Sequence, residues 1–168
     1  MTRQQSAMSA FFLPRPSKTL AVRTACVALA TYFFFGYICR PAWIRGSSME
    51  PTYSDGGFVL LWKPGANSGL KPGDIVAAAL SGDSIMLLKR VAALEGQIVE
   101  FRSGRLYIDG KLEEAPVPDA SCSWELPPRT VDANCVYLIG DNRSMPIDAQ
   151  LFGQTELENI VGRPILHW

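Results

Sequence analysis

One continuous apolar run near the N-terminus constrains this chain more than any other feature. The run extends from Leu20 to Cys39 and contains a single charged residue, Arg23, near its start. About 20 apolar residues are enough to cross a bilayer as a helix. An arginine near the end of such a helix can extend its side chain to the membrane interface. The run therefore predicts a transmembrane helix over residues 20–39.

Two other interpretations of the run stay open. A cleaved signal peptide normally has a shorter apolar stretch followed by an A-x-A type site, and no clean site of that kind follows this run. A helix buried in a soluble core normally has a polar face, which this run lacks. The first 23 residues carry four basic residues and no acidic one. By the positive-inside rule, residues 1–19 are expected in the cytoplasm and residues 40–168 outside it, although Arg40 and Arg45 argue against this orientation.

After residue 40 the pattern changes to short apolar runs separated by glycine, proline and aspartate. No later segment shows sustained helical periodicity. Ser103-Gly104 and Asp109-Gly110 are typical of hairpin turns. Residues 113–134 are rich in proline and polar residues and predict a surface loop or small insertion. The runs predict strands over residues 58–62, 74–80, 84–94, 97–102, 105–109 and 135–140, with a last apolar piece at 160–168 that could close the sheet.

The composition argues against two classes of function. The 168 residues include 16 basic and 16 acidic side chains, so the formal net charge of zero gives no basic face for nucleic acid. Four cysteines include no C-x-x-C pair, which argues against a zinc site, and we expect no metal or other cofactor. Cys122 and Cys135 flank the proline-rich segment. They form a disulfide, or they are unrelated and Cys135 is buried in a strand.

The stretch GSSMEPTYSDG, residues 46–56, places two serines before a proline turn shortly after the apolar run. Serine becomes a good nucleophile only when a base takes its proton. The one histidine, His167, is next to the C-terminus, so a Ser-His-Asp arrangement would need the tail to fold into the site. A lysine can replace histidine when burial lowers the lysine pKa towards neutrality.

Lys89 is the lysine that is best placed for burial. It alone lies inside an apolar strand, where the alternation of side chains puts it on one face with Leu87 and Val91. A charged amine on an apolar face is costly unless the amine is neutral or paired. The alternative is a lysine in an edge strand that extends its amine to solvent.

Four short blocks then follow the apolar run in a fixed order. Together they resemble the type I signal peptidase family, membrane-bound serine peptidases with a Ser-Lys dyad, and the related peptidases that mature conjugative pilins. The resemblance runs from the apolar segment to the tail after the last block and implies an antiparallel β-sheet or coiled-barrel catalytic domain. The blocks are Ser48-Met49-Glu50-Pro51-Thr52, Pro72-Gly73-Asp74-Ile75-Val76, Lys89-Arg90-Val91 with Gly96, and Gly140-Asp141-Asn142-Arg143 followed by Asp148.

The resemblance makes Ser48 the nucleophile and Lys89 the general base. In some members a hydroxyl two residues before the nucleophile assists the oxyanion hole, and this chain has Gly46 there. Backbone N–H groups are therefore expected to hold the oxyanion, with Gly46 allowing close approach. Pro51 is expected to make the rigid turn that fixes where Ser48 points.

Other matching positions imply packing or substrate contacts. Ile44 and Leu88 match positions that line the small substrate pockets of the family, and ordinary core packing is the alternative. Arg90 is expected to pair with Asp141, unless the two form only a surface ion pair, which would contribute ~0–1 kcal/mol. The remaining motif positions in the candidate site are Met49 and Asp148.

The last block departs from the family pattern. Pro146 stands where the serine that orients the lysine is expected, Ala149 replaces a second serine and Gln150 replaces an arginine. Since Ser144 is the nearest hydroxyl in sequence, we expect Ser144, a backbone carbonyl or an ordered water to orient Lys89. The chain also lacks the large inserted β-domain of many bacterial members.

These features predict a membrane serine endopeptidase that removes signal peptides from exported proteins. Its expected partners are precursor proteins, with small residues at the first and third positions before the cut, and membrane lipid. One alternative is a peptidase dedicated to maturing one pilin or conjugative-transfer protein. Another is a catalytically inactive relative that binds exported peptides as an added strand.

Overall fold

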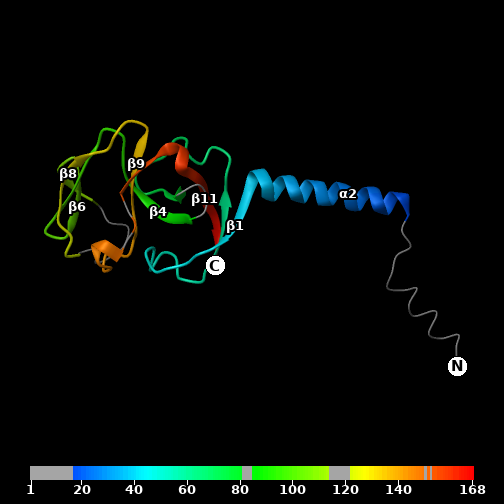
Figure 1. Ribbon diagram of the computed structural model, residues 1–168, viewed down its shortest axis with the longest axis horizontal. Helices are drawn as coiled ribbons and strands as arrows, with labels where there is room; N and C mark the ends of the chain where they lie inside the picture. Colours follow the sequence, from blue (N-terminus) through cyan, green and yellow to red (C-terminus); the bar gives the residue numbers. More distant parts are fainter. Residues whose placement is uncertain (1–16, 81–84, 114–121, 150, 152) are drawn as a thin grey trace, which may run out of the picture. The chain divides into compact units, whose positions relative to one another are not determined.

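A computed structural model describes residues 17–80, 85–113, 122–149, 151 and 153–168 (Figure 1). The chain divides into two compact units, residues 1–36 and residues 37–168. Among the described residues, the first unit contains helix α2, and the second is built mainly from strands.

The N-terminal unit contains helix α2, Lys18–Phe33, which continues as the π-helical segment η1, Phe34–Ile38. Ser17 caps the start of α2, since its side-chain oxygen accepts a hydrogen bond from the Leu20 N–H at 3.1 Å. The 21 residues of Lys18–Ile38 have a mean hydropathy of 1.4, with none buried in the strongest window, so by length and composition the helix can cross a membrane. The predicted helix over 20–39 thus begins two residues earlier and ends before Cys39.

The second unit contains a seven-stranded and a four-stranded sheet, with antiparallel pairing throughout. This confirms the expected mainly β, antiparallel fold class. In spatial order, the larger sheet comprises β1 (Cys39–Trp43), β2 (Phe58–Trp62), β11 (Ile160–His167), β3 (Ile75–Leu80), β4 (Ile85–Leu94), β9 (Cys135–Ile139) and β10 (Gly153–Glu156). The smaller comprises β7 (Lys111–Leu112), β6 (Arg105–Ile108), β5 (Ile98–Arg102) and β8 (Leu126–Thr130). Two short 3-10 helices are η2 (Ile147–Ala149) and η3 (Leu157–Asn159).

All seven predicted strands are present, each within one residue of its predicted ends. Four further strands, β1, β7, β8 and β10, were not predicted. Strand β8 lies within the segment that was expected to be a loop or insertion, so that prediction is wrong for residues 126–130. Part of the same segment, residues 114–121, lies outside the described residues.

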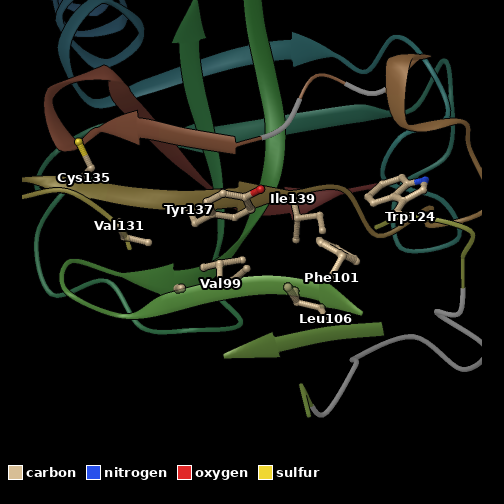
Figure 2. Close-up of a cluster of buried hydrophobic side chains, with 10 residues drawn as sticks. Val99, Phe101, Leu106, Trp124, Val131, Cys135, Tyr137 and Ile139 are labelled. Carbon is tan, nitrogen blue, oxygen red and sulfur yellow. The ribbon is translucent and has the colours of Figure 1, made fainter. Parts of the chain in front are cut away.

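Strand β9 connects two hydrophobic cores because all five of its side chains are buried. Tyr137 and Ile139 face the four-stranded sheet, where they meet Phe101 and Trp124 (Figure 2). Alternate β9 residues face a second cluster with β3 and β4. A third cluster lies beneath the segment between β1 and β2 and contains Ile44, Met49, Tyr53, Val59, Leu61 and Ala77.

The four cysteines do not form a disulfide. Cys122 lies against the β5–β6 turn, where its N–H and its thiol both donate to the Gly104 carbonyl, at 3.0 and 3.3 Å. Cys135 belongs to the cluster of Figure 2, at the opposite end from Trp124. The alternative in which Cys122 and Cys135 are bonded is therefore wrong, because the Cys122 thiol faces Gly104.

Candidate functional site

Ser48 lies in a loop of residues 44–57 that leaves β1 and returns to β2. The ends of the loop are fastened together, since the Ile44 N–H donates to the Gly57 carbonyl at 2.8 Å and the Gly56 N–H to the Ile44 carbonyl at 2.9 Å. Met49, which is 2% exposed, anchors the middle of the loop in the core beneath it. These contacts hold Ser48 half-buried near the surface.

Gly46 serves this loop through its backbone conformation. Its φ is +89°, a value that side-chain-bearing residues rarely adopt, and a Cβ built on it would meet nothing within 4 Å. Its N–H donates to the Asp55 carboxylate at 2.7 Å and is therefore already used. The Ser48 N–H, by contrast, has no acceptor within the described part of the chain, so it remains available as a backbone donor.

The turn after β9 holds the loop from the other side. The Asn142 N–H donates to the Ser48 carbonyl at 3.1 Å, and the Asn142 side-chain amide donates to the Ser47 carbonyl at 3.0 Å. The Thr52 hydroxyl donates to the Asp141 carboxylate. Sequence reasoning gave Thr52 and Asn142 no role, although both lie inside motif blocks. Their contacts fix the backbone on both sides of Ser48.

Asp141 joins the remaining motif blocks. The Arg90 guanidinium donates to both Asp141 oxygens, at 2.7 and 2.6 Å, and also to the Gly73 carbonyl at 2.7 Å. Asp141 is only 3% exposed. The predicted pairing of Arg90 with Asp141 is therefore present, as a buried bidentate pair and not as a surface ion pair. Three of the four sequence blocks meet at this carboxylate, and Arg90 links the fourth block through the Gly73 carbonyl.

Lys89 is buried, with 2% of its surface exposed. It lies on β4 opposite Val76 of β3. Burial lowers the pKa of the Lys89 amine from 10.5 to about 8, and the nearby negative charge of Asp141 partly opposes this change. Within the described residues the amine makes no hydrogen bond or ion pair. Lys89 is thus not a surface lysine in an edge strand, and its amine can lose its proton near neutral pH.

Ser48 lines a cleft of about 70 Å³ together with Ile44, Gly46 and Leu88, so the structure brings the predicted pocket residues to the predicted nucleophile. Lys89 lines a neighbouring pocket of about 120 Å³. Leu87 of β4 lines both cavities. In this arrangement no hydrogen bond joins the described side chains of Ser48 and Lys89.

Four residues that the sequence singled out make no hydrogen bond with Lys89 in the described part of the chain. The Ser144 hydroxyl donates to the Asn142 side-chain oxygen at 2.6 Å, so it stabilises its own exposed turn. Asp148 is exposed on η2, and Pro146 is exposed just before η2. Pro51, after a cis peptide bond, is exposed in the nucleophile loop. The contacts of Ser144 do not support the orienting role that was expected of it.

Trp124 is a further residue that sequence reasoning missed. Its indole N–H donates to the Met145 carbonyl at 3.0 Å, while its ring packs 5.3 Å from that of Phe101 (Figure 2). Met145 also accepts a weak hydrogen bond from the Ser47 hydroxyl at 3.7 Å. Trp124 therefore connects the four-stranded sheet to the turn that holds the nucleophile loop. In the sequence, its role was indicated only by the presence of one tryptophan in an otherwise polar, proline-rich segment.

Comparisons with known proteins agree on one family. A family model described as signal peptidase, peptidase S26, matches residues 17–168. Signal peptidase IB of Staphylococcus aureus strain COL is 29% identical over 157 residues, with 82% of each chain covered. Thylakoidal processing peptidase 1 of Arabidopsis thaliana is 34% identical over 83 residues, which cover 49% of this chain and 24% of that protein. A solved signal peptidase I from Enterococcus faecalis V583 is 21% identical, with a TM-score of 0.46, covering 57% of this chain and 97% of that one.

Proposed function

This chain belongs to the signal peptidase family, peptidase S26, whose members are serine endopeptidases that remove signal peptides, and we propose that Ser48 is its nucleophile and Lys89 its general base. The observation that carries the proposal is the burial of Lys89, which lowers the pKa of its amine to about 8. A neutral amine can accept the proton of a serine hydroxyl, whereas an ammonium cannot.

The reaction proceeds in two stages. The Ser48 oxygen attacks the scissile carbonyl carbon as its proton passes to Lys89, and the Ser48 N–H donates to the resulting oxyanion. The Lys89 ammonium then gives its proton to the departing amine, which leaves an acyl-enzyme. In the second stage, Lys89 accepts a proton from water, the water oxygen attacks the ester, and the proton returns to Ser48. No charge or atom is left over.

The substrate strand is expected to lie along β4. Strand β4 pairs with β3 over residues 85–90 but with β9 only from Arg90 onward, so the other edge of residues 86–89 carries no partner strand among the described residues. An extended peptide can add to such an edge through backbone hydrogen bonds. The cleft beside Ser48 is small, at about 70 Å³, which supports a preference for small side chains before the cut.

The apolar helix supports attachment to the cell (inner) membrane as a single-pass protein, with membrane lipid as its surroundings. We place the N-terminus in the cytoplasm because basic residues cluster before and at the start of the helix. The catalytic unit then lies outside the cytoplasm. Ser48 comes ten residues after Ile38, where the helical segment ends, so the nucleophile is tethered to the anchor by a short stretch of chain.

The test is cleavage of a precursor protein by the full chain in detergent, followed by N-terminal sequencing of the product. Ser48→Ala and Lys89→Ala are each expected to abolish cleavage while the protein still folds. Ser47→Ala is the matched control and should keep most activity, because its hydroxyl makes only the weak contact with Met145. If Ser47→Ala is inactive and Ser48→Ala is active, the assignment is wrong by one residue.

The same assay separates the alternatives. A peptidase dedicated to one pilin would leave a general precursor intact but cut its own substrate. An inactive relative would bind precursors without releasing a new N-terminus from any of them.

A further inference from the structure

The amine of Lys89 needs a partner that turns it towards Ser48. The family pattern has a serine for this purpose, but this chain has Pro146, which lacks a hydroxyl and an N–H. The Ser144 hydroxyl donates to Asn142 instead. The remaining candidate partners line the pocket of about 120 Å³ to which Lys89 itself contributes.

The strand register places Thr155 on the same face of the sheet as Lys89. Thr155 of β10 lies opposite Val136 of β9, and Val136 packs in one buried cluster with Val91 of β4. Side chains of cross-strand partners project from the same face. Lys89 precedes Val91 by two residues, so it shares that face. Thr155 and Lys89 accordingly line the same pocket.

The walls of this pocket offer few polar groups. The Gln154 side chain is already committed, since its oxygen accepts from the Asp132 N–H at 3.0 Å and its amide donates to the Asp132 carboxylate at 2.6 Å. The Thr155 hydroxyl has no partner within the described residues. It is therefore the uncommitted side-chain hydroxyl that faces the same space as Lys89. The other lining residues have no polar side-chain atoms: Ala78, Leu87, Leu138, Leu151 and Gly153.

We propose that Thr155 is the positioning residue for Lys89 and acts through one water molecule bound between its hydroxyl and the amine. The water accepts a hydrogen bond from Lys89 and donates one to Thr155, which leaves the nitrogen lone pair free to face Ser48. A pocket of about 120 Å³ exceeds the ~10–15 Å³ that one water needs, and the two side chains supply polar partners. This inference rests on the proposed role of Lys89 as the general base.

The test compares Thr155→Val and Thr155→Ser in the full chain in detergent. Valine keeps the shape of threonine and suits a strand, whereas serine keeps the hydroxyl. Thr130→Val on exposed β8 is the matched control. Precursor cleavage is measured against pH, with kcat taken on the alkaline plateau. Thr155→Val should lower kcat about tenfold and leave KM within about twofold, because the lost contact orients the base and does not grip the peptide. Thr155→Ser should stay within about twofold of the parent.

The acid limb of the pH profile gives a second readout. A hydrogen bond accepted from Lys89 favours its charged form, so losing it should lower the pKa of the amine and move the limb to lower pH. A merely structural role would not shift the limb in this direction.

An unchanged kcat and pH profile in Thr155→Val would overturn the inference. A loss of kcat in Thr155→Ser as large as that in Thr155→Val would also overturn it, because serine keeps the hydroxyl. A tenfold loss in Ser144→Ala with none in Thr155→Val would assign the role to Ser144. These outcomes require that the parent cleaves and that Lys89→Ala does not. If Lys89→Ala retains activity, the proposed function has failed instead.

Discussion

Burial of Lys89 destabilises the folded chain while it prepares the amine to act as a base. The folded pKa of about 8 lies below the ordinary value of 10.5. Between these pH values the unfolded chain holds a proton that the folded chain lacks, so the free energy of unfolding should rise with pH from about 8 to about 10.5. Below about pH 8, burial of the Lys89 amine lowers the free energy of unfolding by its full amount, roughly 3 kcal/mol.

The variant Lys89→Met tests whether burial of the Lys89 amine destabilises the folded chain. Methionine has a similar length and carries no charge, so the variant should be inactive and more stable than the parent at about pH 7, by up to roughly 3 kcal/mol. It should also lose the rise in stability above about pH 8. Urea unfolding of both proteins at about pH 7 and about pH 10 measures the difference. A variant that is less stable at about pH 7 would show that the amine is stabilised in its charged form.

In the parent, cleavage should fall as pH drops below about 8, because Lys89 then holds its proton.

Asp141 is the acid whose loss should affect most contacts at once. Asp141→Asn should lower the free energy of unfolding by roughly 3 kcal/mol, because the buried Arg90 charge loses its counter-ion. Cleavage should fall as well, since asparagine has one acceptor oxygen and cannot accept from both Thr52, which holds the Ser48 loop, and the Nε–H of Arg90. Glu100→Gln is the matched control, because Glu100 forms a 3.4 Å pair with the exposed Arg102 that should contribute ~0–1 kcal/mol. Equal effects of the two substitutions on unfolding would contradict the role of Asp141.

At the scale of elements, the predicted and the missed strands differ in their place in the sheets. The four missed strands are the outermost ones: β1 and β10 in the larger sheet, β7 and β8 in the smaller. Edge strands tolerate proline and polar residues because one side of their backbone needs no partner strand. Accordingly β1 contains Pro41, β8 contains Pro127 and Pro128, and β10 reads GQTE. The interior strands contain apolar runs that made their sequence pattern sufficient, and this holds even for β11, which contains Pro164.

The candidate site shows a similar division. Short motifs and the burial of Lys89 could be predicted because each depends on neighbouring residues in one block. The contacts of Trp124 with Met145 and the shared face of Thr155 and Lys89 depend on which strands lie side by side. Which strands are neighbours is decided by the order of strands in the sheet, and a short stretch of sequence does not show that order. The contacts of Ser144 could not be predicted for the same reason, because proximity in sequence does not show that its hydroxyl donates to Asn142.

The hairpin turns of the four-stranded sheet provide a prediction for this element. Gly104 has a φ of +70°, and a Cβ on it would lie 1.6 Å from the Cys122 carbonyl oxygen, so Gly104→Ala must displace backbone. Gly110 has a similar φ of +75°, but a Cβ there would meet nothing within 4 Å. Gly110→Ala should cost ~1–2 kcal/mol from its backbone conformation alone, and Gly104→Ala distinctly more. Urea unfolding of both variants measures the difference. Equal losses would show that Cys122 does not pack against this turn.

At the scale of the whole molecule, three motif blocks that are far apart in sequence meet at one carboxylate, and the fourth lies one hydrogen bond further away. Asp141 receives hydrogen bonds from the nucleophile loop and from β4, and Arg90 extends the network to the Gly73 turn. Spacing between the blocks can therefore vary while the site keeps its geometry, because the connections run through the folded sheet.

The orientation in the membrane is the prediction that belongs to the whole chain. Basic residues before and within the first turns of the helix should keep the N-terminus in the cytoplasm and place residues 40–168 outside. A protease added to cells with a permeabilised outer layer should digest the catalytic unit and spare an epitope at the N-terminus. A phosphatase that is active only outside the cytoplasm should be active when fused after Trp168. The control replaces Arg15, Lys18 and Arg23 by neutral residues. The activity of the fused phosphatase should then fall, because Arg40 and Arg45 become the main positive charges beside the helix and favour keeping the C-terminal side in the cytoplasm. An inactive fusion to the unmodified chain, with the catalytic unit protected from protease, would reverse the orientation and separate the site from exported substrates.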